Sequence, residues 1–443
     1  MDFYRSIFLP ARLFFILGAI IVTTVLAYAF PFLLVIAAAA GALLALMVVL
    51  DMILLYQGRT RITVRRSMAS KLSLADDNII HLTIRNLAPF ALQMEIIDEL
   101  PEQFQERNFQ IPVYLESNAM HDQKYSVRPL TRGIYVFGVT HVFISTWIGL
   151  IKRRTNHGAD AAVPVYPSII QMKKYELKTF ARTATEYGVK KVRRIGHSYE
   201  FDHIKQYTRG DDYRSINWKA TGRRAQLMVN QYDDEKSQQV FCVIDRSRVM
   251  HMPFYGLSLL DYAVNAALVI SNIVLGKQDK AGLITFADKP TTLIKADRSK
   301  LQLRKILDAL YHEQEAPVEA NYENLYRGIR NVVNGRSLLF LYTNFESTYA
   351  LQRVLPQLRR LNDQHLLVVI MFENTEITAD TSINVETLED VYRQITAEHF
   401  SLMKIQLVQQ LKQFGIISIL TKPEHLTVST INKYLELKSR GMI

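Results

Sequence analysis

The chain has 443 residues, of which 49% are hydrophobic and 21% are charged. This length supports two or three domains, and this hydrophobic content excludes a disordered protein. The net charge of +11 is uneven, because residues 151–230 hold 17 Lys and Arg against 7 Asp and Glu. The single cysteine, Cys242, excludes an internal disulfide and is typical of a small core residue.

An uncharged segment, residues 13–50, predicts a membrane anchor at residues 1–57. As a helix it would measure roughly 57 Å, nearly twice the hydrocarbon thickness of about 30 Å. We therefore expect two transmembrane helices, at about 13–30 and 32–55, with a turn at Pro31.

Basic residues flank both expected spans, which places both ends of the anchor, and the body that follows, in the cytoplasm. Two alternatives stay open. Residues 1–29 also fit a secretory signal that ends in an Ala-Tyr-Ala cleavage site, and the apolar segment also fits a buried hairpin. The flanking basic residues are Arg5, Arg12, Arg59, Arg61, Arg65 and Arg66.

Short segments that alternate apolar and polar residues fill residues 58–167. Examples are RITVRR, IIHLTIRN and QMEIID, separated by turn-forming Pro and Gly. This period of two predicts an antiparallel β-sandwich of about 100 residues.

From residue 240 to 443 the pattern changes to apolar runs separated by helical segments. Near-continuous runs such as VFCVI, LLFLY and LLVVIMF predict parallel strands that are buried on both faces. We therefore expect a doubly wound, Rossmann-like α/β domain. Residues 168–239 form a linker block between the two domains. Helices are expected at about 257–275, 300–311, 322–333, 349–361 and 387–414, followed by a final helix.

Polar side chains follow the predicted strands, where the ligands of a doubly wound sheet bind. Asp245 and Ser247 follow the first strand, and Asn344 follows the run LLFLY. Carboxylate and hydroxyl oxygens suit Mg²⁺, which prefers six oxygen ligands. In the alternative interpretation, Asp245 caps the loop and Ser247 bonds to the backbone.

Residues 196–224, GHSYEFDHIKQYTRGDDYRSINWKATGRR, concentrate charge before the α/β domain. Paired carboxylates beside histidines can do acid and base work or bind a metal, so an enzyme is the alternative function. Ion pairs lower carboxyl pKa values, however, so we expect a self-neutralising network or a partner contact, with Ile216 and Trp218 as an apolar anchor. The acidic and histidine residues are His197, Glu200, Asp202, His203, Asp211 and Asp212, and the basic residues are Arg209, Arg214, Lys219, Arg223 and Arg224.

The basic block also contains aromatic residues that suit stacking on nucleic acid. An anchored chain meets anionic lipid first, where each Lys or Arg contributes about 1 kcal/mol. We therefore expect an anionic membrane surface, and no nucleic acid, as a partner. The basic residues expected to face headgroups are Lys152, Arg153, Arg154, Lys190, Lys191, Arg193 and Arg194.

Common catalytic motifs are missing from the sequence. It has no G-x-x-x-x-G-K-[ST] phosphate loop, no G-x-S-x-G elbow and no H-E-x-x-H. We therefore expect a non-enzymatic protein that needs no cofactor.

Taken together, the order of these segments resembles the bacterial domain-of-unknown-function 58 (DUF58) family, whose C-terminal part is similar to a von Willebrand factor A domain. The resemblance covers nearly the whole chain. The motifs that carry it are Asp98 with Leu100-Pro101, Arg132-Gly133 with Tyr135, Phe137 and Gly138, Gly149-Leu150, Val165-Tyr166-Pro167, Glu200-Phe201 and the run Asp211, Asp212, Arg214, Asn217, Trp218, Lys219 and Arg223.

The resemblance also implies a metal position and a partner. Asp245 and Ser247 match the Asp-x-Ser start of the cation motif, but Val249 and Asn344 replace a Ser and an Asp, which predicts weak or absent Mg²⁺ binding. Proteins of this family are associated with MoxR-type AAA+ ATPases in the assembly of other proteins. We therefore expect an assembly module in the bacterial inner membrane that uses the Gly-Asp-Asp block for structure or partner contact.

Overall fold

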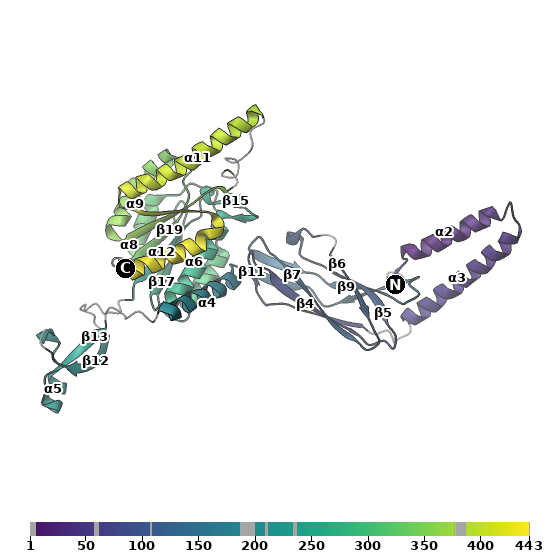
Figure 1. Cartoon of the computed structure of the whole chain (residues 1–443), viewed down its shortest axis with the longest axis horizontal. Coiled ribbons are helices and arrows are strands. Elements are labelled where there is room, and N and C mark those ends of the chain that lie inside the picture. The colour runs from purple at the N-terminus through teal and green to yellow at the C-terminus, as the bar shows by residue number, and fades with distance from the viewer. Residues whose placement is uncertain are drawn as a thin grey trace. The chain divides into compact units, whose positions relative to one another are not determined.

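The computed structural model describes residues 6–56, 62–106, 109–186, 200–208, 211–233, 237–375, 377 and 387–442 (Figure 1). The chain divides into two compact units, Met1–Ile169 and Ile170–Ile443. The boundary lies two residues after the predicted end of the sandwich, and the linker block belongs to the second unit.

Two exposed apolar helices follow a short strand, β1 (Ile7–Phe8). Helix α3 (Phe32–Tyr56) has 25 residues and is about 37 Å long, enough to cross a bilayer. Helix α2 (Ala11–Leu26) has 16 residues and ends four residues before the predicted position. Pro31 keeps the helix from continuing through Phe30, because the residue before a proline disfavours helical backbone. A third apolar helix, α6 (Leu259–Gly276), is as long as a span but is mostly buried in the second unit.

The first unit contains three small sheets that form a β-sandwich-like body. Their strand orders are β1-β10-β9-β5-β6, β2-β4-β7 and β3-β11-β8, and only the pair β3–β11 is parallel. Inward residues of β4, β5 and β9 alternate with more exposed ones, as the sequence predicted. The strands are β2 (Ile62–Ser67), β3 (Leu72–Ser73), β4 (Asn78–Asn86), β5 (Leu92–Asp98), β6 (Gln110–Leu115), β7 (Met120–Val127), β8 (Gly133–Phe137), β9 (Thr140–Ser145), β10 (Lys152–His157) and β11 (Ala161–Tyr166), with a 3-10 turn η1 (Glu102–Phe104) after β5.

The second unit begins with helix α4 (Ile169–Glu186) and a two-stranded hairpin that we call the arm. Strands β12 (Glu200–Gln206) and β13 (Met228–Asp233) form the arm, and their connection holds the 3-10 turn η2 (Tyr213–Ser215) and helix α5 (Trp218–Arg224). The described part of the predicted linker therefore contains a hairpin with its own strand pairing.

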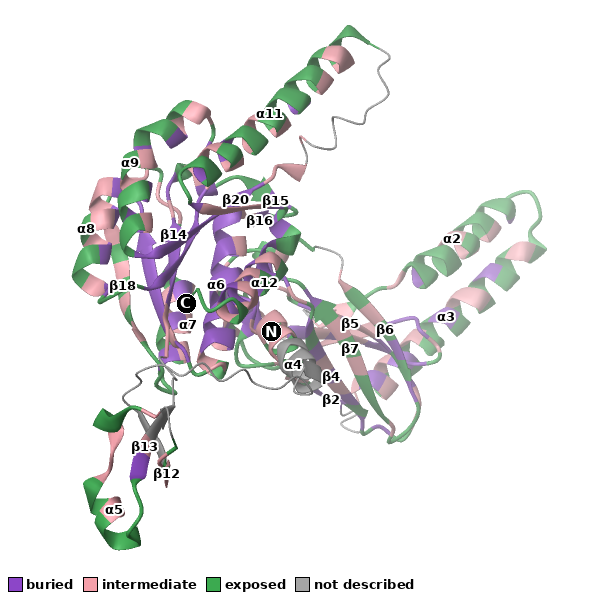
Figure 2. Ribbon diagram, turned by 60° about the vertical axis from the view of Figure 1, so that its left-hand side comes forward, coloured by how far each residue is buried: buried purple, intermediate pink, exposed green. Residues whose placement is uncertain are grey.

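A six-stranded sheet forms the α/β domain, in the order β18-β17-β14-β19-β20-β21. Helices cover both faces of its buried strands (Figure 2), with α6, α7 and α12 on one core and α8, α9 and α11 on the other. The prediction of uniformly parallel strands is wrong at one edge, because β18 runs antiparallel to β17. The remaining elements are β14 (Gln239–Asp245), η3 (Arg248–Met250), β15 (Pro253–Phe254), β16 (Leu257–Ser258), β17 (Lys280–Phe286), β18 (Pro290–Asp297), α7 (Gln302–His312), α8 (Tyr322–Val332), β19 (Leu338–Tyr342), α9 (Thr348–Gln364), β20 (Leu366–Phe372), α11 (Leu388–Gln413), β21 (Ile417–Thr421), η4 (Pro423–His425) and α12 (Leu426–Ser439).

Candidate functional site

The carboxyl end of β14 holds a buried carboxylate, Asp245. Its Oδ1 accepts from the Ser247 backbone N–H at 2.9 Å, and its Oδ2 accepts from the Thr343 hydroxyl at 2.7 Å. The Tyr322 hydroxyl lies 2.7 Å from the same Thr343 oxygen. Burial raises the pKa of Asp245, and the hydrogen bonds from Ser247 and Thr343 oppose this effect. The carboxylate is thus held inside the protein by local donors.

The other predicted cation ligands do not complete a site around Asp245. The Ser247 hydroxyl is buried and makes no hydrogen bond with the described residues. The Asn344 Oδ1 accepts from the Lys404 ammonium of α11 at 2.5 Å. Val249 packs partly buried against the core. No group of three His, Cys, Asp or Glu that suits a metal occurs among the described residues.

A strip of ion pairs joins the loop after β14 to residues 313–319. Arg246 lies 2.8 Å from Glu313, Arg248 lies 3.3 Å from Glu319, and His251 pairs with Glu315. Backbone bonds accompany them, from Ala316 N to Arg246 O and from Arg248 N to Val318 O. The loop over Asp245 is thus fixed at several points and leaves the carboxylate without solvent exposure.

In the arm, the two adjacent carboxylates have different partners. Asp211 accepts from the Lys205 ammonium at 2.8 Å and from the Thr208 N–H and hydroxyl at 2.9 Å each. These contacts lower the pKa of Asp211 to about 2, and the hydrogen bond from Lys205 has the largest effect. Asp212 accepts from the Arg214 backbone N–H at 3.0 Å. Asp211 is therefore paired with Lys205, which precedes it in the chain, whereas Asp212 accepts a hydrogen bond from the backbone of η2.

Asn217 organises the helix of the arm. Its Oδ1 caps α5 by accepting from the Ala220 N–H at 2.9 Å, and its Nδ2 donates to the Asn230 Oδ1 at 2.8 Å. This contact ties the α5 end of the connection to β13.

The expectation that Trp218 is an apolar anchor is wrong, because 71% of its surface is exposed. A two-stranded hairpin with one short helix is too small to enclose an indole ring. Arg214, Lys219 and Arg223 form no ion pair within the described part of the chain. The side chains of Glu200, Asp202 and His203, and all of His197 and Arg209, lie outside the described residues, as do Arg5, Arg59, Arg61, Lys190, Lys191, Arg193 and Arg194.

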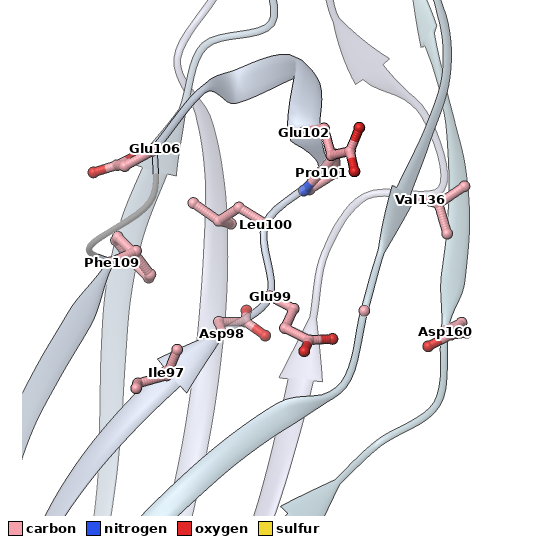
Figure 3. A pocket seen from close by; sticks show the side chains of 11 residues that line it. Ile97, Asp98, Glu99, Leu100, Pro101, Glu102, Glu106, Phe109, Val136 and Asp160 are labelled. Atoms are coloured by element: carbon pink, nitrogen blue, oxygen red, sulfur yellow. The ribbon is translucent and has the colours of Figure 1, made fainter.

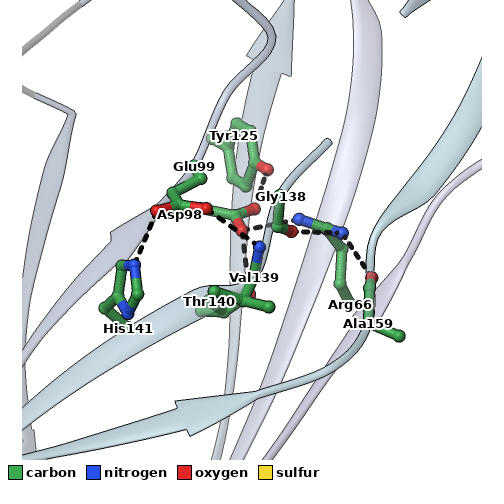
Figure 4. Close-up of polar contacts among 9 residues, drawn as sticks. All are labelled: Arg66, Asp98, Glu99, Tyr125, Gly138, Val139, Thr140, His141 and Ala159. Carbon is green, nitrogen blue, oxygen red and sulfur yellow. Dashed lines mark hydrogen bonds and ion pairs between the residues drawn. The ribbon is translucent and has the colours of Figure 1, made fainter. Parts of the chain in front are cut away.

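A polar network lies at one end of the sandwich (Figure 4). Asp98 lies at the end of β5. Its carboxylate accepts hydrogen bonds from the Arg66 guanidinium at 2.7 Å, from the Thr140 hydroxyl at 2.8 Å and from the Tyr125 hydroxyl. Burial, followed by the charge of Asp98, raises the pKa of Tyr125. Arg66 also donates to the Gly138 carbonyl at 2.9 Å. Asp98 and Gly138, from two separate motifs of the sequence, therefore meet in one network.

An acidic pocket of about 430 Å³ adjoins this network (Figure 3). The Glu99 carboxylate lies 2.7 Å from His141 Nε2 and accepts from the Val139 N–H at 3.2 Å. A Cβ atom on Gly138 would lie 2.2 Å from Glu99 Oε2, so a larger residue at this position would displace the Glu99 carboxylate from its present place. The pocket is lined by Ile97, Asp98, Glu99, Leu100, Pro101, Glu102, Glu106, Phe109, Val136, Gly138 and Asp160.

Comparison with known proteins places the arm and most of the α/β domain in a family. Residues 203–391 match the model of a family described as "Protein of unknown function DUF58". Over these residues the chain belongs to the DUF58 family. The match begins in the arm and includes the end of β14, whereas the apolar helices and the sandwich precede it.

Individual similar proteins are distant from the DUF58 chain. The "Uncharacterized protein YeaD" of Bacillus subtilis (strain 168) is 25% identical over 43% of this chain and 49% of its own length. The chain thus spans about half of that curated relative. The hypothetical protein BatB of Bacteroides thetaiotaomicron has a TM-score of 0.30 at 12% identity, over 46% of this chain and 99% of that one. The CARDB domain of the PF1109 protein of Pyrococcus furiosus has a TM-score of 0.18 at 10% identity, over 24% of this chain and 93% of that one.

The strand order of the DUF58 α/β domain follows the doubly wound pattern 3-2-1-4-5-6, with β14 as strand 1. In this pattern the switch point lies beside the first strand, where Asp245 and Thr343 end neighbouring strands. Thr343 is one residue before the predicted Asn344, so its position was foreseeable. Tyr322 was not, because it starts a helix and carries no sequence signal for this contact.

Proposed function

We propose that this DUF58 protein is a membrane-anchored, non-enzymatic interaction module that helps to assemble other proteins. The observation that carries the proposal is the exposed aromatic and basic surface of the arm. Tyr213 and Trp218 expose 68% and 71% of their surfaces. Trp, Tyr and Arg are the residue types that dominate binding energy at protein interfaces.

The charges of this surface favour an acidic partner. Arg214, Lys219 and Arg223 surround the aromatic side chains in sequence and have no ion-pair partner within the described residues. Complementary charge accelerates association and excludes wrong partners. On the family resemblance, the partner we propose is a MoxR-type AAA+ ATPase.

The geometry of the carboxylates supports a non-enzymatic role. Asp211 is held ionised by Lys205 and Thr208, with a pKa of about 2, and cannot donate a proton near neutral pH. Asp245 has no exposed surface on which to meet a substrate. No observation among the described residues favours the enzyme that uses the 197–212 cluster.

We further propose that α2 and α3 form a two-helix anchor in the bacterial inner membrane, with the sandwich and the α/β domain in the cytosol. Leu13 near the start of α2 and Leu44 in the middle of α3 pack with Leu150 of the sandwich. Trp147, exposed by 76%, precedes Leu150 and suits the membrane interface. Arg153 donates to the Leu55 carbonyl at 2.7 Å, which places a cation at the cytosolic end of α3.

Purification of the full chain from native membranes tests the partner proposal. We expect the wild type to retain an AAA+ ATPase and the double variant Tyr213→Ala with Trp218→Ala to lose it, while both have the same unfolding midpoint. Tyr349→Ala, at an 80% exposed tyrosine of α9, is the matched control and keeps the partner. Equal recovery with the arm variant, or no AAA+ ATPase with the wild type, contradicts the proposal.

A further inference from the structure

Strand β8 has an unpaired edge within the described part of the sandwich. In the order β3-β11-β8, Gly133–Phe137 pairs with β11 on one side only. Ile134 and Val136 expose 61% and 53% of their surfaces, whereas Tyr135 and Phe137 are buried. An open edge with exposed apolar side chains is a template for another strand.

The register identifies which backbone groups face this edge. Pro164 of β11 lies opposite Ile134 and has no N–H, so the two form a pair without mutual hydrogen bonds. The N–H and C=O groups of Ile134 and Val136 therefore point away from β11. Gly138 continues the alternation, and its N–H donates to the Glu99 carbonyl at 3.0 Å. Among the described residues, Glu99 thus occupies the position beside Gly138, and no strand pairs with Val136 on this side.

The open edge ends at the acidic pocket, which Val136 and Gly138 both line. Figure 3 shows Glu99 and Glu102 reaching from the segment after β5 toward the side of Val136 and Asp160. Glu102 and Asp160 form no ion pair among the described residues. A group of carboxylates on a chain with a net charge of +11 selects a cationic ligand.

We propose that this edge and pocket bind an extended segment of a partner protein. The segment adds as a strand beside β8 and places a Lys or Arg side chain among the carboxylates of Glu99, Glu102 and Asp160. Backbone bonds to Ile134 and Val136 provide affinity, and the carboxylates select the basic residue. A second copy of β8 does not supply that residue, because Gly133–Phe137 contains no Lys or Arg. The site is separate from the arm, so either proposal can fail alone.

Fluorescence anisotropy with the full chain in uncharged detergent micelles tests the proposal. The probe is a blocked, labelled nonapeptide that alternates Val and Lys, and the matched probe alternates Val and Glu. We expect saturable binding of the Lys peptide alone. Equal binding of the two peptides, or no saturable binding of the Lys peptide, overturns the proposal.

Two kinds of variant separate the edge from the pocket. Val136→Pro removes an outward N–H donor without touching the β11 pairing, and we expect about tenfold weaker binding, whereas Val136→Thr binds as the wild type.

Glu102→Gln with Asp160→Asn removes two charges, and we expect a loss of tenfold or more, whereas Glu116→Gln, at an exposed site of the same sandwich, changes nothing. Unchanged affinity in the carboxylate variant overturns the site. Unchanged affinity in a folded Val136→Pro variant overturns strand addition. If Val136→Pro does not fold, the carboxylate variant decides.

Discussion

Asp51 is a buried carboxylate inside the apolar helix α3, and the sandwich provides its hydrogen-bond donors. Its Oδ2 accepts from the backbone N–H groups of Leu150 and Ile151 at 2.9 Å each, and its Oδ1 accepts from the Thr146 hydroxyl at 2.5 Å. Burying a carboxylate among apolar side chains costs free energy unless its oxygens accept hydrogen bonds. The contact therefore fixes the base of the apolar helices to the loop after β9.

We predict that Asp51→Ala lowers the free energy of unfolding of the first unit by about 3 kcal/mol. The substitution leaves two buried N–H groups and a hydroxyl without an acceptor, and each unsatisfied group costs about 1–3 kcal/mol before partial relaxation. Thermal unfolding of the full chain in detergent measures the loss. Asp77→Ala, at an exposed site of the same unit, is the control. Equal midpoints for the two variants contradict this account of the loop contact.

Asp245 gives a prediction with a defined pH dependence. Because burial raises its pKa, the folded state binds the proton more tightly than the unfolded state, and ionisation costs stability once the pH passes the usual carboxyl range. We predict that Asp245→Asn raises the unfolding midpoint relative to the wild type near pH 7 and that the difference shrinks as the pH falls to about 4, where the Asp245 carboxyl is protonated.

Thermal unfolding at the two pH values checks this prediction, with and without millimolar Mg²⁺. Glu319→Gln, which removes an exposed carboxylate beside the same loop, is the control and shows no such pH-dependent gain. A lower midpoint for Asp245→Asn at pH 7 contradicts the prediction, and micromolar Mg²⁺ affinity of the wild type by calorimetry shows instead that Asp245 is an ionised cation ligand.

At the scale of single residues, the sequence predicted which side chains carry polar groups more reliably than which residues those groups contact. Asp245 and Ser247 lie together because two residues at a strand end are always close. Asn344 contacts Lys404, 60 residues downstream, and Asp51 contacts Thr146, 95 residues downstream. Such contacts depend on how separate elements pack, which no local pattern encodes.

Helix α11 is attached to the end of β19 by a half-buried lysine. The Lys404 ammonium donates to the Asn344 Oδ1 at 2.5 Å and to the Phe345 carbonyl at 2.8 Å. Burial lowers the pKa of Lys404 to about 8, and the charge of Glu346 partly opposes this. The folded state therefore binds fewer protons than the unfolded state between about pH 8 and pH 10.

The sign of this linkage is that the free energy of unfolding rises with pH across that interval. We predict a rise of about 2 kcal/mol in the wild type relative to Lys404→Met between pH 8 and pH 10. Denaturant titration at several pH values measures it. Lys412→Met, at an exposed site of the same helix, keeps the wild-type rise. A parallel pH dependence of wild type and Lys404→Met excludes the half-buried ammonium of Lys404 as its source.

Helices and strands were predictable where an apolar pattern extended over many residues. The buried runs of β14, β19 and β20 and the helices between them lie where the sequence predicted them. The antiparallel strand β18 was missed, although PTTLIKAD alternates as a half-buried edge strand should. Its run is less apolar than those of its neighbours, so the alternation was hidden beside the stronger signals.

At the scale of the whole molecule, the sequence allowed a membrane hairpin, a cleaved signal or a buried hairpin. The exposed surfaces of α2 and α3 remove the buried hairpin, because a core hairpin encloses its apolar side chains. Length and exposure do not distinguish an anchor from a signal, because both have an apolar helix near the N-terminus. Chemical labelling distinguishes them.

The chain suits such labelling because it has one native cysteine. Cys242 is buried in β14, and burial raises the pKa of its thiol to about 12, so it does not react with a maleimide. Tyr28, between α2 and α3, is 98% exposed, and Tyr349 is 80% exposed on the α/β domain. Cysteines at these two positions therefore report the two sides of the membrane.

We predict that a membrane-impermeant maleimide labels Tyr28→Cys in intact spheroplasts and labels Tyr349→Cys only after lysis. The apolar hairpin then carries residue 28 across the bilayer, while the basic residues after α3 hold the body in the cytosol. Labelling of Tyr349→Cys in intact cells places the body outside. A mature chain that has lost residue 28 identifies a cleaved signal, and protection of residue 28 even in intact spheroplasts shows that the helices enter the membrane without crossing it.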